Sequence, residues 1–258
     1  MEALKVAGVC GDALRGYGDD LQVLDNDVFD LFKVGPPHVD GWQGSEHRGQ
    51  GPFHRVTIRG NRIIANMNNI GHPLAQTGGQ PIFQKAQAGG IVFYDVVVED
   101  NVTDSAGVKA ITLRGVDGGI VRRNVVLTAH GHSHPRIVVA GACRNIVIED
   151  NVTEAVSVVE GGTYHGIIAR RNRKISGTAL PDWSIGAGSV DPGTPTVPDD
   201  DDDDGATPPP TDPDDPETPE PPEVPETPEQ PPAPDLAAAR AALAAAQVKI
   251  TEALGAIS

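Results

Sequence analysis

The feature that most constrains the fold is a short pattern that recurs six times between residues 21 and 174. In each copy, aliphatic residues alternate with other residues, a polar pair follows, and an asparagine precedes another short strand. The copies are LQVLDNDV (21–28), VTIRGNRI (56–63), VVVEDNVT (96–103), IVRRNVV (120–126), IVIEDNVT (146–153) and IIARRNRK (167–174). Such a repeat indicates one structural unit stacked on the next.

The spacing of the asparagines indicates the length of each unit. They are Asn26, Asn61, Asn101, Asn124, Asn151 and Asn172, and the spacings of 23, 27 and 21 residues suit one coil of a parallel β-helix. The spacings of 35 and 40 residues fit either one coil with an inserted loop or two coils of which one copy is degenerate. Further strand patterns at 108–115 and 136–142 lie between the copies, so each coil contains more than one strand.

The residue types in the pattern predict how the coils stack. Alternating Val and Ile side chains fill the interior, and the polar alternates face solvent. Asparagine tolerates the left-handed conformation of a sharp turn, and in stacked turns its side chain reaches the backbone of the next coil. We therefore expect a structural ladder that includes Asn61, Asn101, Asn124, Asn151 and Asn172.

A ladder of this kind resembles the pectate-lyase-like β-helix superfamily, over about residues 10–185. The resemblance implies an all-β chain folded as a right-handed parallel β-helix, which we assign to residues 1–188. The superfamily includes lyases, hydrolases, phage spikes and adhesins, so the resemblance constrains the function much less than the fold.

Composition separates a second segment, residues 189–235, from the first. Residues 191–235 contain 16 of the 36 acidic residues and no Lys or Arg, so 20 acidic residues face 20 Lys and Arg in the rest of the chain. A Pro-Glu-x triplet repeats from Pro216 to Glu229 and favours extended polyproline II. We predict a disordered acidic Pro-rich linker, with an SH3-type ligand or a calcium-buffering tract as alternatives. The absence of a basic excess argues against nucleic-acid binding.

The third segment, residues 236–258, has the pattern of a short amphipathic helix. Asp235 supplies an N-cap. Large aliphatic residues seven apart alternate with alanines in an a/d heptad pattern, formed by Leu236, Ala239, Leu243, Ala246, Ile250, Ala253 and Ile257. A lone helix of this length is marginal in water. We expect it to self-associate as a coiled coil, with a trimer favoured, or to dock on the rod or on another protein.

The chain start and the cysteines provide weaker constraints. Residues 1–5 lack the pattern of a secretion signal, and no apolar run reaches membrane-spanning length. Strand-like sequence begins within the first ten residues, which predicts an uncapped first coil that promotes assembly. Cys10 and Cys143 form no metal-binding pair, and both are expected to be buried thiols.

The first candidate site is the stretch from Pro37 to Gln43, followed by Glu46 and His47. It is similar to a His-x-Asp-Gly-x-Gln stretch common in β-helix proteins of the phage-spike and polysaccharide-lyase type. His38, His47 and Asp40 are candidate acids and bases on a solvent face. Trp42, Gln43 and Asp40 are candidate sugar contacts. The alternative is that Asp40 and Gly41 form a turn and Trp42 fills an inserted loop.

Two further groups of residues suggest sites. Alternate residues of an extended segment share a face, so His130, His132 and His134 are candidates for binding carbohydrate, or for one metal ion, although no acidic residue nearby completes a ligand set. The alternative is a histidine loop that binds nothing. The doublets Arg122-Arg123 and Arg170-Arg171 occupy the positions of Glu99-Asp100 and Glu149-Asp150 in the repeat. They predict ion pairs between successive coils, about 4.8 Å apart. The resemblance to the lyases of this superfamily implies the alternative, in which an arginine acts as a base beside calcium-bound carboxylates.

Two functions fit these observations. The first is a structural and receptor-binding spike or fibre of a phage-like particle or gene transfer agent. It would be located on the virion or particle surface and would engage host surface polysaccharide as a homo-oligomer or with another particle structural protein. The alternative is a polysaccharide lyase or glycoside hydrolase. We expect no cofactor, with calcium as the alternative. The complete motif set of polygalacturonase-type hydrolases is absent from the sequence, so we favour the spike.

Overall fold

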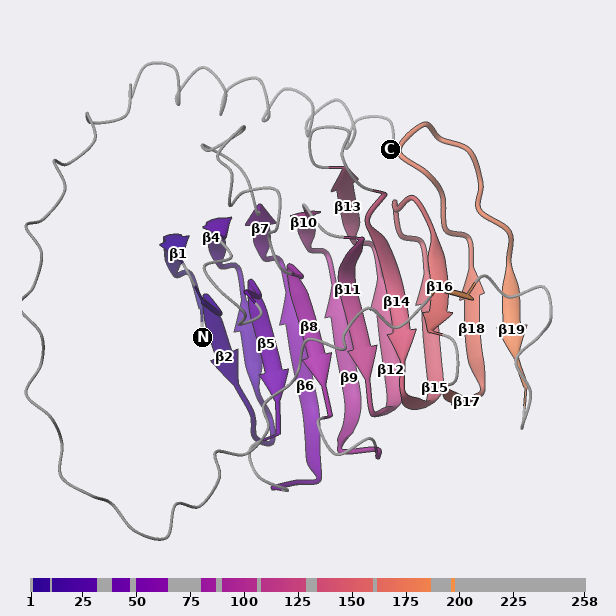
Figure 1. Cartoon of the computed structure of the whole chain (residues 1–258), viewed down its shortest axis with the longest axis horizontal. Helices are drawn as coiled ribbons and strands as arrows, with labels where there is room; N and C mark the ends of the chain where they lie inside the picture. Colours follow the sequence, from indigo (N-terminus) through magenta and orange to yellow (C-terminus); the bar gives the residue numbers. More distant parts are fainter. Residues whose placement is uncertain are drawn as a thin grey trace, which may run out of the picture. The chain divides into compact units, whose positions relative to one another are not determined.

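The structure is a computed structural model that describes residues 2–9, 11–31, 39–46, 50–64, 80–86, 90–105, 108–128, 134–159, 162–186 and 196–197. Within these ranges the chain is all-β, as predicted, and its strands form three sheets in which the neighbours are almost all parallel (Figure 1). None of the described residues forms a helix with the length and hydrophobicity needed to cross a bilayer.

Successive strands along the chain belong to the three sheets in turn, so each described sheet contains about every third strand. Sheet I contains β1 (Lys5–Val9), β4 (Asp27–Leu31), β7 (Arg62–Ile64), β10 (Val102–Ser105) and β13 (Val125–Thr128). Sheet II contains β2 (Leu14–Gly16), β5 (Trp42–Ser45), β8 (Ile82–Lys85), β11 (Lys109–Arg114), β14 (Arg136–Ala140), β16 (Val156–Val159) and β20 (Thr196–Val197). Sheet III contains β3 (Gln22–Leu24), β6 (Phe53–Arg59), β9 (Phe93–Glu99), β12 (Val116–Arg122), β15 (Ala142–Glu149), β18 (Ile167–Arg170) and the antiparallel β19 (Trp183–Ile185), and β17 (Thr163–His165) pairs with β15.

The chain therefore passes from sheet I to sheet II to sheet III and returns to sheet I, and we call each such passage a coil. In sheet I, Asp27 pairs directly with Arg62, and Arg62 pairs directly with Val102. The spacings of 35 and 40 residues are thus single coils, and the alternative of two coils with a degenerate copy is wrong. This succession is compatible with the β-helix expected from the repeat.

In sheet III the repeat extends over nine residues and ends at each asparagine. The copies are GDDLQVLDN (18–26), FHRVTIRGN (53–61), FYDVVVEDN (93–101), VDGGIVRRN (116–124), CRNIVIEDN (143–151) and YHGIIARRN (164–172). Residues at the fourth and sixth positions face the core and are mostly fully buried, as Val96 and Val98 are. Residues at the second, fifth and seventh positions face outward.

The turn differs in one respect from the prediction. The left-handed residue is the eighth of the repeat, not the asparagine: φ is 53° at Asp25, 57° at Asp100, 53° at Arg123 and 54° at Arg171. The third position is left-handed as well, as at Arg55, where φ is 61°. The physical reason is that the asparagine must direct both its backbone N–H and its side chain towards the next coil, so the preceding residue makes the turn. For arginine this conformation costs roughly 1 kcal/mol.

The core lies between the three sheets and is built from inward-facing Val, Ile, Leu and aromatic residues. Cys143 is one of these core residues and is fully buried, as predicted; burial raises the pKa of its thiol to about 11. Cys10 lies outside the described residues.

The predicted linker and helix are described only at one point. Thr196 and Val197 form β20, which pairs in parallel with β16 in sheet II, so a strand of this sheet lies within the stretch 189–235. Residues 198–258, which include the predicted helix 236–258, lie outside the described residues. Both segment assignments stay predictions.

Candidate functional site

The asparagines form a buried ladder that joins consecutive coils. From Asn26 to Asn172, the backbone N–H and the side-chain Nδ2 of each asparagine donate to Oδ1 of the next at 2.8–3.1 Å. Nδ2 of Asn124 also donates to the Val98 carbonyl of the preceding coil at 2.9 Å. Each interior side chain thus links three coils. The expected ladder is present, and its residues have a structural role.

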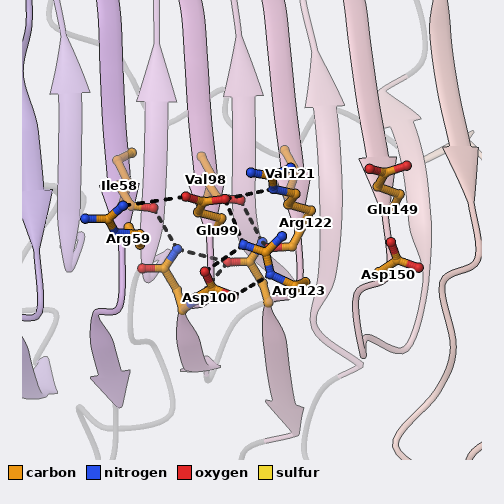
Figure 2. Close-up of polar contacts among 12 residues, drawn as sticks. Ile58, Arg59, Val98, Glu99, Asp100, Val121, Arg122, Arg123, Glu149 and Asp150 are labelled. Carbon is orange, nitrogen blue, oxygen red and sulfur yellow. Dashed lines mark hydrogen bonds and ion pairs between the residues drawn. The ribbon is translucent and has the colours of Figure 1, made fainter. Parts of the chain in front are cut away.

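Acidic and basic side chains pair across the coils just before the asparagines (Figure 2). Glu99 accepts from Arg122 Nε at 2.7 Å and from Arg123 at 2.9 Å, while Arg123 holds Asp100 through two hydrogen bonds of 2.7 and 2.8 Å. The next pair of coils repeats the arrangement with Glu149, Asp150, Arg170 and Arg171.

These contacts confirm the predicted coil-to-coil pairing of the doublets. Hydrogen bonds from Arg123 and Arg171 hold the pKa of Asp100 and Asp150, respectively, below its usual range. The guanidinium of Arg170 does the same for the pKa of Glu149. The two arginine doublets are therefore engaged with carboxylates of the preceding coil. This engagement accounts for them without a catalytic role.

Three residues of the first predicted site, Asp40, Trp42 and Gln43, are buried, so the expectation of a solvent face is wrong for these three. Trp42 is fully buried on β5, in register with the inward-facing Leu14 and Ile82, and its Nε1 donates to Gln84 Oε1 at 3.2 Å. It therefore belongs to a core strand and not to an inserted loop, and its ring is not available to a sugar.

Asp40 and Gln43 are also buried. Asp40 Oδ1 accepts the backbone N–H of Gln80 at 3.0 Å, and its Oδ2 accepts from Gln43 Nε2 at 3.2 Å. The carboxylate thus ties the start of β5 to the segment before β8. His38 and His47 lie outside the described residues, so their proposed acid and base roles stay predictions.

The histidine group is described only in part. His134 is exposed, and His130 and His132 lie outside the described residues. Within the described ranges, no group of three or more His, Cys, Asp or Glu residues is placed to hold a metal ion. The convergence of the three imidazoles stays a prediction.

One acidic side chain has a strongly perturbed titration. Asp104 lies on β10 between Ile64 and Leu127 of the neighbouring strands and is 8% exposed. Its Oδ1 has no hydrogen-bond partner, and burial raises the pKa of the carboxyl to about 7. Such values occur at functional sites and also at structural ones.

Chemically diverse side chains gather on the outward face of sheet III. We define three rows on it. The central stripe contains Thr57, Val97, Ile120, Val147 and Ile168. The ion-pair row, at the seventh position, contains Arg59, Glu99, Arg122, Glu149 and Arg170. The mixed row, at the second position, contains His54, Tyr94, Asp117, Arg144 and His165.

The mixed row is held by contacts along the stack. His54 Nδ1 lies 3.3 Å from Asp19 Oδ1, and the His54 ring stacks on Tyr94 with centroids 5.0 Å apart. Arg144 pairs with Asp117 at 3.0 Å. The backbone N–H of His54 donates to Asp19 and lowers the pKa of that carboxyl. The row thus presents rings and charges to solvent at regular intervals.

Sequence reasoning missed the mixed row, although a signal for it exists. The pattern in the sequence runs from the aliphatic core to the asparagine, and the first three positions of the nine-residue repeat lie before it. Extending the alignment towards the N-terminus places Asp19, His54, Tyr94, Asp117, Arg144 and His165 in one column. The left-handed residue at the third position interrupts the alternation of inward-facing and outward-facing side chains. A strict alternation therefore does not extend across this position.

Comparisons of the chain with family models, with curated proteins and with solved structures found no match.

Proposed function

We propose that residues 1–188 form a right-handed parallel β-helix that serves as the shaft of a structural, receptor-binding spike or fibre of a phage-like particle. The observation that carries the proposal is the asparagine ladder. Its hydrogen bonds run without interruption from Asn26 to Asn172 and fix every coil on the next. An element of this kind supports a role in holding and presenting a surface.

The arrangement of the charged residues supports the same function class. The outward carboxylates and guanidinium groups of sheet III pair along the stack. Catalysis by proton transfer needs groups that converge on one reacting atom. Pairs distributed evenly over several coils suit a long contact surface better, and we propose that this surface engages a host surface polysaccharide.

Two parts of the proposal concern the segments after the β-helix. We propose that the stretch 189–235, apart from the sheet II strand Thr196–Val197, is a spacer. We also propose that the heptad positions of residues 236–258 join copies of the chain, with a trimer favoured, or bind another particle structural protein. The test is the mass of the full chain in solution compared with a chain ending at residue 235. An oligomer that is lost on truncation supports the spike. If the number of chains in the oligomer is unchanged, the role given to the helix is refuted.

Polysaccharide engagement is tested separately, with purified neutral and acidic surface polysaccharides immobilised for binding measurements. Saturable binding to at least one glycan supports the proposal, and its absence throughout this panel contradicts it. A pull-down from particles identifies the structural protein, if any, that copurifies.

A second candidate, a polysaccharide lyase or hydrolase, is favoured by one observation. A carboxyl group whose pKa lies at about 7, as at Asp104, has the titration that suits a general acid or base near neutral pH. Incubation with the bound glycan, followed by absorbance of unsaturated products and by new reducing ends, tests this candidate. Product formation that is lost in Asp104→Asn would replace the spike with an enzyme, and no product would exclude catalysis on that glycan.

A further inference from the structure

The central stripe of sheet III is an apolar strip on an otherwise charged face. Ile168 is 38% exposed, and Val97, Ile120 and Val147 are partly exposed. The ion-pair row lies on one side of the stripe and the mixed row on the other. An apolar centre with a polar rim is the usual composition of a protein–protein contact.

The size of this face suits a modest contact between two proteins. A seven-residue strand such as β6 is about 23 Å long at about 3.3 Å per residue, and five strands about 4.8 Å apart span about 24 Å. The face therefore measures about 550 Å², and two such faces bury about 1,100 Å², near the lower limit for a specific interface. The strands β6, β9, β12, β15 and β18 lie side by side in parallel register (Figure 1).

The charges indicate which surface fits this face. If a second copy faces it across a twofold axis parallel to the stacking direction, the coils stay in register and the strands run in opposite directions. The ion-pair row of one copy then faces the mixed row of the other. Arg122 lies opposite Asp117, Glu149 lies opposite Arg144, and the Tyr94 hydroxyl lies opposite the Glu99 carboxylate.

The other face-to-face twofold arrangement depends on where its axis lies. With an axis parallel to the strands and through the coil of Arg122, the coil order reverses and each row faces itself, so Arg122 lies opposite Arg122 and Asp117 opposite Asp117. Like charges brought together at a contact cost free energy. An axis between the coils of Glu99 and Arg122 instead sets these two residues opposite each other, so the charges support a contact between two copies and the disulfide test decides the axis.

We infer that the outward face of sheet III binds the same face of a second copy of this chain, around a twofold axis parallel to the stacking direction and with the coils in register. The central stripes pack on each other, and the ion-pair row of each copy contacts the mixed row of the other. This inference goes beyond the proposed function because it needs neither a polysaccharide nor residues 236–258.

The first test measures the mass of the full chain by sedimentation over a range of concentrations. The wild type forms dimers or multiples of dimers, and Val147→Lys, which places a charge in the central stripe, weakens the sheet III contact more than about tenfold. Ile175→Lys is the matched control, because Ile175 is 46% exposed and lies outside sheet III. It leaves association unchanged, and circular dichroism verifies that both variants fold.

The second test fixes the geometry by disulfide formation in a Cys10→Ser background. Asp117→Cys combined with Arg122→Cys forms a covalent dimer under mild oxidation, because position 117 of each copy faces position 122 of the other. Arg122→Cys alone forms none. A covalent dimer of the single variant, or none in the double variant, overturns the proposed axis.

The inference is also overturned if the protein is monomeric at all concentrations, or if association is lost only on removing residues 236–258 and is insensitive to Val147→Lys. The latter outcome leaves the proposed function intact. Absence of glycan binding together with a dimer sensitive to Val147→Lys refutes polysaccharide engagement and retains the sheet III contact.

Discussion

Replacing Asn124 by alanine tests the energetic role of the ladder. Asn124 is fully buried, and its Oδ1 accepts two hydrogen bonds from Asn101, one from the backbone N–H and one from Nδ2. Its own Nδ2 donates to Val98 O at 2.9 Å and to Asn151 Oδ1 at 3.0 Å. Alanine removes these contacts and a further one from Nδ2 to Arg122 O, and it leaves two buried donors of Asn101 without this acceptor.

The cost follows from those two donors. A buried donor without a partner costs about 1–3 kcal/mol, so we expect Asn124→Ala to lower the free energy of unfolding by about 3–5 kcal/mol. A single domain is commonly stable by about 5–15 kcal/mol, so the loss is large. Urea unfolding followed by circular dichroism measures it.

The matched control is the same substitution at the end of the ladder. Asn26 Oδ1 accepts the backbone N–H of the exposed Leu4 at 3.1 Å, whereas Asn124 Oδ1 accepts from two buried donors. Water replaces that acceptor, so Asn26→Ala costs about 1 kcal/mol. A loss below about 1 kcal/mol at Asn124, or equal losses at the two positions, would refute the reasoning.

Three further predictions concern titration and burial. The folded pKa of Asp104 is raised from 3.8 to about 7, so its contribution to stability is present below pH 4 and is lost as the pH rises to about 7. Asp104→Asn should therefore be more stable than the wild type at pH 8 by on the order of 3 kcal/mol, but not at pH 3.5. Equal thermal midpoints at pH 8 would contradict this. The pKa values of Asp100, Glu149 and Asp150 are lowered from the ordinary values of 3.8 for Asp and 4.5 for Glu. Their stabilisation is therefore fully present above about pH 4.5 and is lost as the pH falls through their folded pKa values. In acid titrations the triple amide variant Asp100→Asn/Glu149→Gln/Asp150→Asn should lose less stability than the wild type, and equal losses would show that the pairs contribute nothing. The Cys143 thiol is fully buried with a pKa of about 11, so in a Cys10→Ser variant it reacts with a thiol reagent at pH 8 only after denaturation, and rapid reaction in the folded state would show that the core is open.

Much of the fold was predictable because the repeat in sheet III carries its own register. The asparagine column fixes where each coil returns, and the opposite charges of Glu99 and Arg122 occupy the same position one coil apart, so their pairing followed from spacing alone. The conformation of the turn did not follow, because an asparagine column does not show whether that residue or its neighbour is left-handed. The ion pairs of Arg123 and Arg171 stabilise a backbone conformation that arginine rarely adopts.

The placement of Asp40 and Trp42 was not predictable for a different reason. Sheet II has no column like the asparagines, and the coils that contain β5 and β8 carry insertions. Without a register, the parity that decides which side chains of β5 face the core is unknown, and a shift by one residue reverses it. Only the pairing of Trp42 with Leu14 and Ile82 shows that the indole faces inward.

Native-state hydrogen exchange at the backbone amides of Asn61, Asn101, Asn124 and Asn151 tests the central claim most directly. Each of these N–H groups is buried and donates to the side chain of the next asparagine at 2.9–3.1 Å. If the ladder joins the coils, these amides exchange only through large-scale unfolding, as slowly as the amides of the core strands. Exchange at the rate of an unprotected turn would contradict the stacked coils and the shaft proposed from them.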